Sequence, residues 1–379
     1  MRVVIFCHSL VSDWNHGNAH FLRGVATELQ SRGHEVDVLE PEDGWSRSNL
    51  LADHGTDAID GFHRAYPTLR SDTYRKESLD LASVLDDADL VVVHEWTDPD
   101  LVAAIGARRA AGRTGILLFH DSHHRSVTDP GAMAAFDLRH YDGVLAFGDP
   151  IRDMYLQHRW TNRAWTWHEA ADTRVFRPLR TVSSERATDG LPDDLRGDVV
   201  WIGNWGDEER TAELEEFLFA PVQRLGLRTT VFGVRYPEEA RSLLASRGID
   251  YRGWLPNYLV PAVFSRFTLT VHVPRRPYLE SLPGIPTIRP FEALACGIPL
   301  VSARWDRTGG LFTPGEDFLV ARSGDEMVRQ IEWLLRDATL RQRLAAHGLA
   351  TIRAHHTCAH RVDQLLAIHA ELRTEAVLS

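Results

Sequence analysis

An arginine and a glutamate stand at the start of a short apolar helix expected within "PTIRPFEALACG". A carboxylate among packed apolar residues is costly to desolvate unless a partner hydrogen-bonds to it. Glu292 therefore either lies in the first helical turn, where the helix dipole favours an acid, or holds a ligand with paired hydroxyls. A pyrophosphate at this helix start would meet backbone amides, the dipole and the Arg289 guanidinium together. Pro286, Thr287 and Ile288 form the loop that leads into the helix, so they belong to the same candidate anion site.

A histidine and an aspartate end a buried apolar run in "LLFHDSHHR", where His120 and Asp121 are followed by His123 and His124. Loop packing, a metal cluster and substrate contact are all open interpretations. Paired histidines bind a metal well only with suitable geometry and a third ligand. We therefore expect substrate contact by His120, a weaker role for Asp121 in orienting an acceptor, and no metal.

Two other segments look like metal sites but have simpler interpretations. Asp98 and Asp100 form an Asp-x-Asp pair directly before "LVAAIGARRAAG", so helix capping is the favoured interpretation. The histidines of "AHHTCAH" lie in a tail that is expected to be helical. Neither segment is retained as a metal site.

Turns that follow expected strands supply further candidate residues, because ligands of doubly wound sheets bind beyond the carboxyl ends of strands. They are Gly203, Asn204 and Trp205 in "WIGNW", where backbone N–H groups suit phosphate oxygens, and His16, Gly17 and Asn18, in a loop expected to face a cleft. In "YRGWLPN", the turn containing Trp254 and Leu255 either reads the edge of a base or is a tight connection. No G-x-G-x-x-G follows the first strand and no P-loop motif occurs, which argues against a dinucleotide oxidoreductase and a P-loop enzyme.

The elements that must position these residues alternate between strand and helix. Apolar runs at 3–7, 35–40, 89–94, 115–120 and 142–147, and again at 198–203, 228–233, 267–273 and 298–302, predict the strands. Near-continuous apolar strands separated by helices are typical of a parallel sheet covered on both faces. The sequence therefore predicts an α/β protein with two Rossmann-like doubly wound domains, a cleft between them and a helical C-terminal tail.

The domain boundaries follow from composition. The polar segment 179–197, rich in Ser, Asp, Gly and Pro, is the expected linker. We therefore expect an N-terminal acceptor-side domain at 1–178 and a C-terminal donor domain at 198–357. Residues 358–379 are expected to form a helix that packs back toward the first domain.

Composition excludes several function classes. The 379 residues have 44% hydrophobic and 25% charged residues and a formal net charge of −11. That charge argues against a protein whose main task is to hold nucleic acid. No apolar run approaches the ~20 residues of a membrane-spanning helix. Three widely spaced cysteines suggest reduced thiols, so we expect a cytoplasmic protein.

Several motifs match one family in the same order. "PTIRPFEALACGIPLVS" resembles the R-x-FEA-x-A-C-G-x-P donor segment of the GT-B-fold glycosyltransferases, specifically the spore-maturation-protein-like (CgeB-like) branch. "ADTRVFRP" is similar to the sequence that closes the first domain, "RGWLP" to the G-x-L-P turn at the nucleotide base, and "FHD" to the strand-end HD of the first domain. The resemblance covers almost the whole chain and is best from about 171 to 361.

The resemblance implies a role for each matching residue. Glu292 would bind the donor ribose, the 286–290 loop with Arg289 the diphosphate, and Gly203 the phosphate turn. Trp254 and Leu255 would flank the base, and His120 would approach the transferred sugar. In related transferases a second acid often stands eight residues before the ribose-binding one, where this chain has Gly284, and no clear lysine follows "WIGNW".

The predicted activity is transfer of a sugar from a UDP-, dTDP- or GDP-linked donor to a hydroxyl of a small molecule or glycan, without a metal or a tightly bound cofactor. Arg289 would stabilise the departing diphosphate. The alternatives are a nucleotide-sugar epimerase of the same architecture and a non-catalytic nucleotide-sugar or glycan-binding protein, the latter suggested by Gly284.

Overall fold

The computed structural model divides into two compact units, and each is described by itself. The first unit consists of Met1–Glu169 with Cys358–Ser379, and the second of Ala170–Thr357. The structure describes all residues except 16, 113, 180–190, 207, 306–307 and 379.

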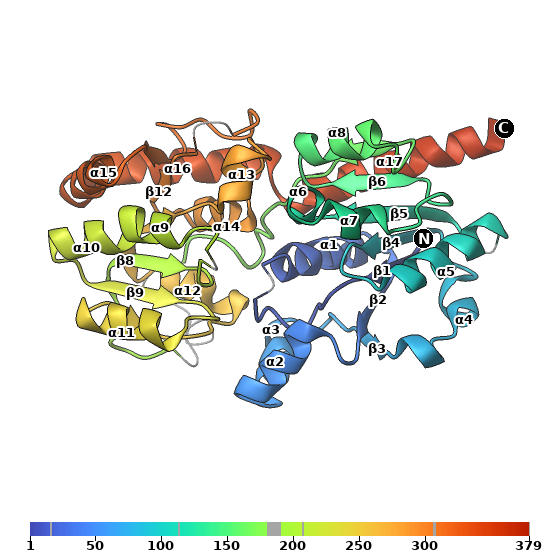
Figure 1. Cartoon of the computed structure of the whole chain (residues 1–379), viewed down its shortest axis with the longest axis horizontal. Coiled ribbons are helices and arrows are strands. Elements are labelled where there is room, and N and C mark those ends of the chain that lie inside the picture. Colours follow the sequence, from blue (N-terminus) through green and yellow to red (C-terminus); the bar gives the residue numbers. More distant parts are fainter. Residues whose placement is uncertain (16, 113, 180–190, 207, 306–307, 379) are drawn as a thin grey trace. The chain divides into compact units, whose positions relative to one another are not determined.

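The first unit is built on a seven-stranded sheet in the order β3-β2-β1-β4-β5-β6-β7, in which every pair is parallel (Figure 1). Its strands are β1 Arg2–Phe6, β2 Glu35–Pro41, β3 Asp72–Tyr74, β4 Leu90–His94, β5 Ile116–Asp121, β6 Gly143–Ala146 and β7 Ala164–Thr166. Its helices are α1 Ala19–Ser31, α2 Trp45–His54, α3 Asp57–Ala65, η1 Lys76–Ser78, α4 Leu81–Leu85, α5 Pro99–Ala110, α6 Arg125–Thr128, α7 Pro130–Ala134, α8 Asp149–Gln157 and α17 Cys358–Leu378. The five strands predicted in this half all form.

The last helix is part of the first unit. The indole of Trp167 donates to the carbonyl of Arg361 at 2.9 Å, and the guanidinium of Arg361 donates to the carbonyl of His168 at 2.8 Å. The first unit is therefore formed by the first 169 residues of the chain together with its last helix.

The side chain of Asp98 accepts hydrogen bonds from the first amides of α5, which confirms that the Asp98–Asp100 pair begins a helix.

The second unit is built on a six-stranded parallel sheet in the order β10-β9-β8-β11-β12-β13. Its strands are β8 Gly197–Ile202, β9 Thr229–Phe232, β10 Asp250–Tyr251, β11 Phe267–His272, β12 Leu300–Ala303 and β13 Leu319–Ala321. Its helices are α9 Thr211–Leu214, the π-helix η2 Glu215–Phe219, α10 Ala220–Leu225, α11 Glu238–Ser246, η3 Asn257–Leu259, α12 Val260–Phe264, α13 Arg276–Glu280, α14 Ile288–Cys296, α15 Gly324–Arg336 and α16 Ala338–His355. The predicted fold class, two doubly wound α/β halves with C-terminal helices, is confirmed.

Residues 170–178 pack with the second unit although the expected boundary lay at 178. Ala171 pairs with Thr357, and the fully buried Phe176 packs in a core that includes Phe291 and Leu294 of α14. Most of the expected linker, residues 180–190, lies outside the described residues.

Candidate functional site

Two arginines lie close enough to a buried histidine at the carboxyl edge of the second sheet to affect its pKa. His272 ends β11, is 4% exposed, and contacts Ser302 of β12 at 2.9 Å. The pKa of His272 is lowered to about 3, mainly by burial and in part by the nearby charges of Arg210 and Arg289. The imidazole is therefore neutral, and a positive field surrounds it, which suits an anion.

Arg210 is held in place by the loop after β8 and the end of β11. Its guanidinium donates to the carbonyl of Asn204 at 2.7 Å and to that of Val273 at 3.2 Å, and it lies over the Trp201 ring at 5.2 Å. The sequence has no clear lysine after "WIGNW". The structure shows a half-buried guanidinium just before α9, fixed by two carbonyls.

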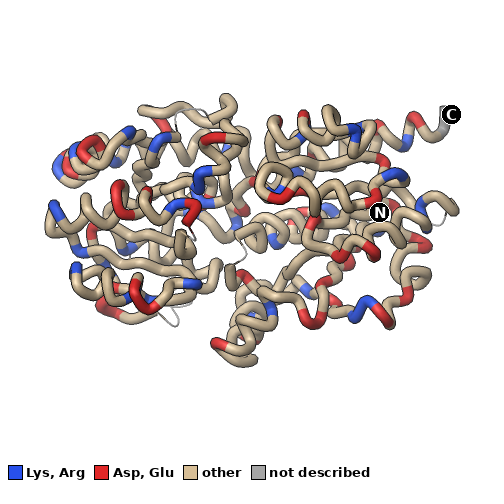
Figure 2. The backbone as a smooth tube through the Cα atoms, viewed as in Figure 1, with Lys and Arg blue, Asp and Glu red and all other residues tan. Residues whose placement is uncertain are grey.

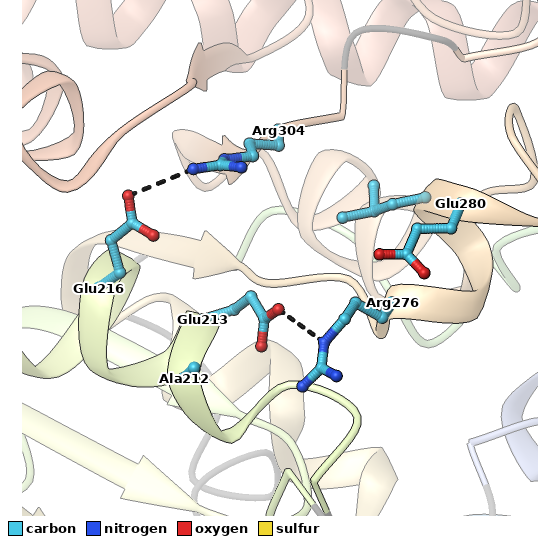
Figure 3. A pocket seen from close by; sticks show the side chains of 7 residues that line it. Ala212, Glu213, Glu216, Arg276, Glu280 and Arg304 are labelled. Atoms are coloured by element: carbon cyan, nitrogen blue, oxygen red, sulfur yellow. Dashed lines mark hydrogen bonds and ion pairs between the residues drawn. The ribbon is translucent and has the colours of Figure 1, made fainter.

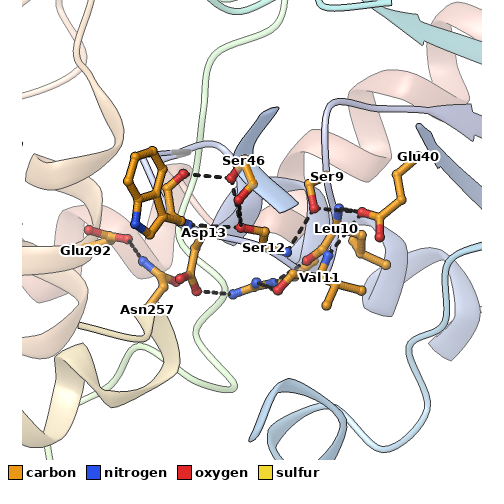
Figure 4. A network of polar contacts seen from close by, with 11 residues as sticks. Ser9, Leu10, Val11, Ser12, Asp13, Glu40, Ser46, Asn257 and Glu292 are labelled. Atoms are coloured by element: carbon orange, nitrogen blue, oxygen red, sulfur yellow. Dashed lines mark hydrogen bonds and ion pairs between the residues drawn. The ribbon is translucent and has the colours of Figure 1, made fainter. Parts of the chain in front are cut away.

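Glu292 is fully buried, and protein groups contact both of its oxygens; Figure 4 shows the contact with Asn257. Asn257 donates to one oxygen at 2.7 Å, and Arg289 pairs with the other. Helix α14 begins at Ile288, so Glu292 lies in the second turn, and the first-turn dipole interpretation is wrong. The burial cost is offset by a guanidinium and an amide instead.

The turn after β8 is tightly constrained. A side chain at Gly203 would lie 2.6 Å from the Trp201 ring, and the N–H of Gly203 donates to Phe232 in the sheet. The side chain of Asn204 accepts from the amide of Val234, and Trp205 packs against the core beside Tyr236. These contacts all fix the conformation of the turn.

The predicted base residues come just before Asn257, and the predicted loop residues lead into α14. Leu255 is buried in the core and Trp254 is half-buried just before Asn257. Thr287 is the N-cap residue of α14, and its hydroxyl lies 3.4 Å from the imidazole of His272, with Pro286 before it and Ile288 after it. Gly284 has a φ of 93°, a conformation that an acidic residue rarely adopts. The acid found here in related transferases would thus be strained.

His120 is 1% exposed in the first unit, at a point where sequence reasoning placed a sugar contact. Its ring packs edge-on against Trp167 at 4.9 Å and against His94 at 5.2 Å. Among the described protein groups neither ring nitrogen has a hydrogen-bond partner. Burial holds the pKa of His120 well below its usual value, so the ring is neutral. A buried imidazole of this kind is costly without a partner, which favours a bound water or ligand group.

Asp121 is fully buried beside a second carboxyl group that sequence reasoning missed. Tyr155 and the amide of His123 donate to Asp121, each at 3.1 Å. The pKa of Asp121 is raised to about 8, mainly by burial and in part by the charge of Glu95. Burial likewise raises the pKa of Glu95 to about 8. Both carboxyls are therefore mainly protonated at neutral pH, and Asp121 does not provide a strong base there.

Glu95 takes part in a buried polar network with its neighbours. The hydroxyl of Ser122 lies 3.2 Å from one oxygen of Glu95 and 2.9 Å from Nε2 of His94, while Nδ1 of His94 lies 2.9 Å from the other oxygen of Glu95. The amide of Asn18 donates to the same hydroxyl. Gly17 lies in the exposed loop before Asn18, and His16 lies outside the described residues.

The loop after β1 is held by Glu40. This carboxylate accepts from the hydroxyl of Ser9 and from the amide of Leu10, each at 2.7 Å, and Figure 4 shows both contacts.

A pocket of about 310 Å³ lies apart from the predicted residues and contains the ion pairs Arg276–Glu213 and Arg304–Glu216 (Figure 3). It is lined by Ala212, Glu213, Glu216, Arg276, Leu279, Glu280 and Arg304.

Within the described part of the chain, no three histidine, cysteine or acidic side chains come together as metal ligands would. None of the described helices is long and apolar enough to cross a membrane. In the view of Figure 2, acidic and basic residues are interleaved over both units.

A family described as "Glycosyl transferase-like" matches residues 210–367, a range that begins at Arg210 and includes His272, Arg289 and Glu292. This match confirms the predicted enzyme class, a glycosyltransferase. No curated protein sequence matches the chain.

Solved structures of glycosyltransferases share the fold over the whole chain. HepE from Anabaena, in complex with UDP and glucose, is 14% identical with a TM-score of 0.69, covering 98% of this chain and 99% of that one. An alpha-glucosyltransferase in complex with UDP-glucose and DNA gives the same four values. Sucrose-phosphate synthase from Thermosynechococcus elongatus is 15% identical with a TM-score of 0.63, covering 99% of this chain and 100% of that one. The predicted GT-B architecture is thus confirmed.

Proposed function

We propose that the protein transfers a sugar from a nucleotide diphosphate sugar to an acceptor hydroxyl without a bound metal. The observation that carries this proposal is the pair of guanidiniums, Arg210 and Arg289, whose charges both act on neutral His272 at the carboxyl edge of the second sheet. Glu292 lies one helical turn from Arg289, next to Asn257. Diphosphate and ribose groups are joined in a nucleotide sugar, and this edge offers cations for one and a carboxylate for the other.

Donor binding would proceed as an exchange of partners. Arg289 and Glu292 are paired in the structure. A diphosphate would draw the Arg289 guanidinium to its oxygens, and the released carboxylate oxygen would accept a hydrogen bond from a ribose hydroxyl. Asn257 would keep the other oxygen in place. The pair thus holds both groups in position until the donor arrives.

Catalysis would rest on the charge that develops as the diphosphate departs. Arg210 is held by two carbonyls and needs little rearrangement to face that charge. Fixed groups of this kind contribute about 2.7–4 kcal/mol each to lowering a barrier. Arg289 and the first amides of α14 would add to the same effect.

The first unit would supply the acceptor side. We propose that His120 contacts the transferred sugar, because both of its buried nitrogens are available to hydroxyl groups. Asp121, mainly protonated at neutral pH, would orient the acceptor by donating a hydrogen bond.

Three finer assignments belong to the proposal. The donor segment around Glu292 supports the spore-maturation-protein-like (CgeB-like) branch. A uridine nucleotide is the first donor to test, since HepE was solved with UDP. Three free, buried cysteines support a cytoplasmic location.

The test is a thermal-shift panel with UDP, GDP, dTDP, ADP and CDP on the wild type, Arg210→Ala and Arg224→Ala. Arg224 is the matched control, because its exposed pair with Asp325 lies on the outer helix α10. A ligand at a hundredfold excess over its dissociation constant stabilises the folded state by about 2.7 kcal/mol. We expect one nucleotide to raise the melting temperature of the wild type and of Arg224→Ala, and to have a much smaller effect on Arg210→Ala.

Product analysis then separates the alternatives. Conversion of the donor sugar without any acceptor would indicate an epimerase. Tight nucleotide-sugar binding with no turnover on any acceptor would indicate a binding protein. A shift that is equal in all three proteins would refute the phosphate role of Arg210.

A further inference from the structure

An indole is exposed at the carboxyl end of β4, among residues that are buried. Trp96 is 42% exposed, whereas Glu95 before it is fully buried and Thr97 after it is 4% exposed. The amide of Glu95 donates to the carbonyl of His120, and that of Thr97 to the carbonyl of His94, each at 2.9 Å. The backbone on both sides is therefore fixed, and the Trp96 side chain faces outward from a rigid strand end.

The indole itself is held by three neighbouring side chains. The Arg125 guanidinium lies over the ring at 4.8 Å and donates to the carbonyl of Glu95 at 3.2 Å. The ring of His123 meets the indole edge-on at 5.3 Å, and that of His8 lies at 5.7 Å with a tilt of 45°. An exposed aromatic ring that is fixed in this way loses little conformational entropy when a ligand packs on it.

The position of Trp96 relates it to the proposed site in the same unit. Strands β4 and β5 are neighbours, and His94 is paired in register with His120. Ligands of doubly wound sheets bind beyond this edge. An exposed tryptophan elsewhere needs no such explanation, as for Trp333, which is 48% exposed on α15.

Charges of both signs surround Trp96, with the Arg125 guanidinium over its ring and two acids after it in the chain, and this favours a neutral ligand. Asp98 and Asp100, two and four residues further along the chain, are exposed and share the single ammonium group of Lys76. The whole chain has a formal charge of −11. Nucleic acid is held largely through neutralisation of its phosphates, so this surface is poorly suited to it. Imidazole rings beside an apolar face suit the hydroxyls and C–H face of a sugar.

We propose that Trp96, with His8 and His123, forms a stacking platform for a neutral saccharide that serves as the acceptor. This proposal rests on the proposed function and names the acceptor class for it. The C–H face of a pyranose ring would lie on the indole, and its hydroxyls would point toward the two imidazoles. His120, on the neighbouring strand, would then lie on the same side of the sheet edge.

The experiment measures binding of labelled wild type, Trp96→Ala, Trp96→Phe and Trp333→Ala to an array of neutral oligosaccharides. Short DNA duplexes and single strands serve as the other arm. Trp333→Ala is the control for loss of an exposed indole. We expect the wild type and Trp333→Ala to bind a common set of saccharides and no DNA. Trp96→Ala should bind the same set about tenfold more weakly, and Trp96→Phe should lie between them.

Three results would each overturn the proposal: equal binding by Trp96→Ala and the wild type, binding of the wild type to DNA alone, or binding to no saccharide. The UDP thermal shift of the same proteins separates this outcome from failure of the proposed function. A UDP shift retained in Trp96→Ala would show that the donor site is intact, whereas its absence in every protein would count against the donor site and not against the platform.

Discussion

The buried carboxyl of Glu95 makes the stability of the first unit depend on pH. Glu95 is fully buried, and burial raises its pKa from 4.5 to about 8. The folded state therefore keeps a proton that the unfolded chain releases near pH 4.5. The stability associated with this proton is fully present below the unfolded pKa and is lost as the pH rises toward about 8.

Glutamine at position 95 should remove this dependence, because it resembles the protonated acid. Its carbonyl can accept from Ser122 and its amide can donate to Nδ1 of His94, the two groups that contact Glu95. Between about pH 5 and about pH 8, the pKa values predict a fall of roughly 3–4 kcal/mol in the free energy of unfolding due to Glu95 alone. We expect Glu95→Gln to gain this amount relative to the wild type over that interval.

The assay is urea unfolding of both proteins at several pH values, with the difference in unfolding free energy plotted against pH. Contributions from other groups largely cancel in the difference. Asp121 is coupled to Glu95, and loss of that charge would lower the pKa of Asp121 and change the difference in the same direction. Glu280→Gln, at an exposed position, is the control and should give a flat difference. A flat difference for Glu95→Gln as well would refute the reasoning.

Two further predictions concern the second unit. Gly203→Ala would place a methyl group 2.6 Å from the Trp201 ring, so we expect a loss of about 1–3 kcal/mol in thermal unfolding. Gly131→Ala is the control and should cost much less, because the added carbon would meet only an oxygen of Asp129 at 4.0 Å. Glu292→Ala would leave Arg289 and Asn257 without their buried partner, so we expect a loss of about 3 kcal/mol in urea unfolding together with weaker nucleotide binding in the thermal-shift assay. Normal nucleotide affinity in that variant would contradict the ribose role of Glu292.

The fold was predictable because its signal is local and repeated. Each central strand is a short run of apolar residues, as in "VVIF" of β1 and "LVVV" of β4, and each is followed by a helix or a loop. Burial on both faces of a parallel sheet imposes this composition on every strand.

The polar partners were not predictable because they meet only through strand order. Nothing in the sequence pairs Glu95 with Ser122, which come together because β4 lies beside β5. His272 ends an apolar run that was interpreted as a strand and nothing more, and its arginine neighbours come from α14 and from the loop after β8. A signal for both was present: each is a titratable residue at the carboxyl end of a predicted strand, the position where His120 was noticed.

The pairing of Glu292 with Arg289 changes what donor affinity should depend on. If the carboxylate were free, a ribose would gain new hydrogen bonds, and Glu292→Ala would remove them all. Because the carboxylate is already bonded to Arg289 and Asn257, donor binding at the proposed site would replace one charge-assisted contact with two others. The net gain is then the difference between these contacts, which requires diphosphate and ribose together. A nucleoside without phosphates would have to break the Arg289–Glu292 pair with no anion to receive the guanidinium. Uridine should therefore bind far more weakly than UDP, by more than the loss of the phosphate contacts to Arg210 would account for.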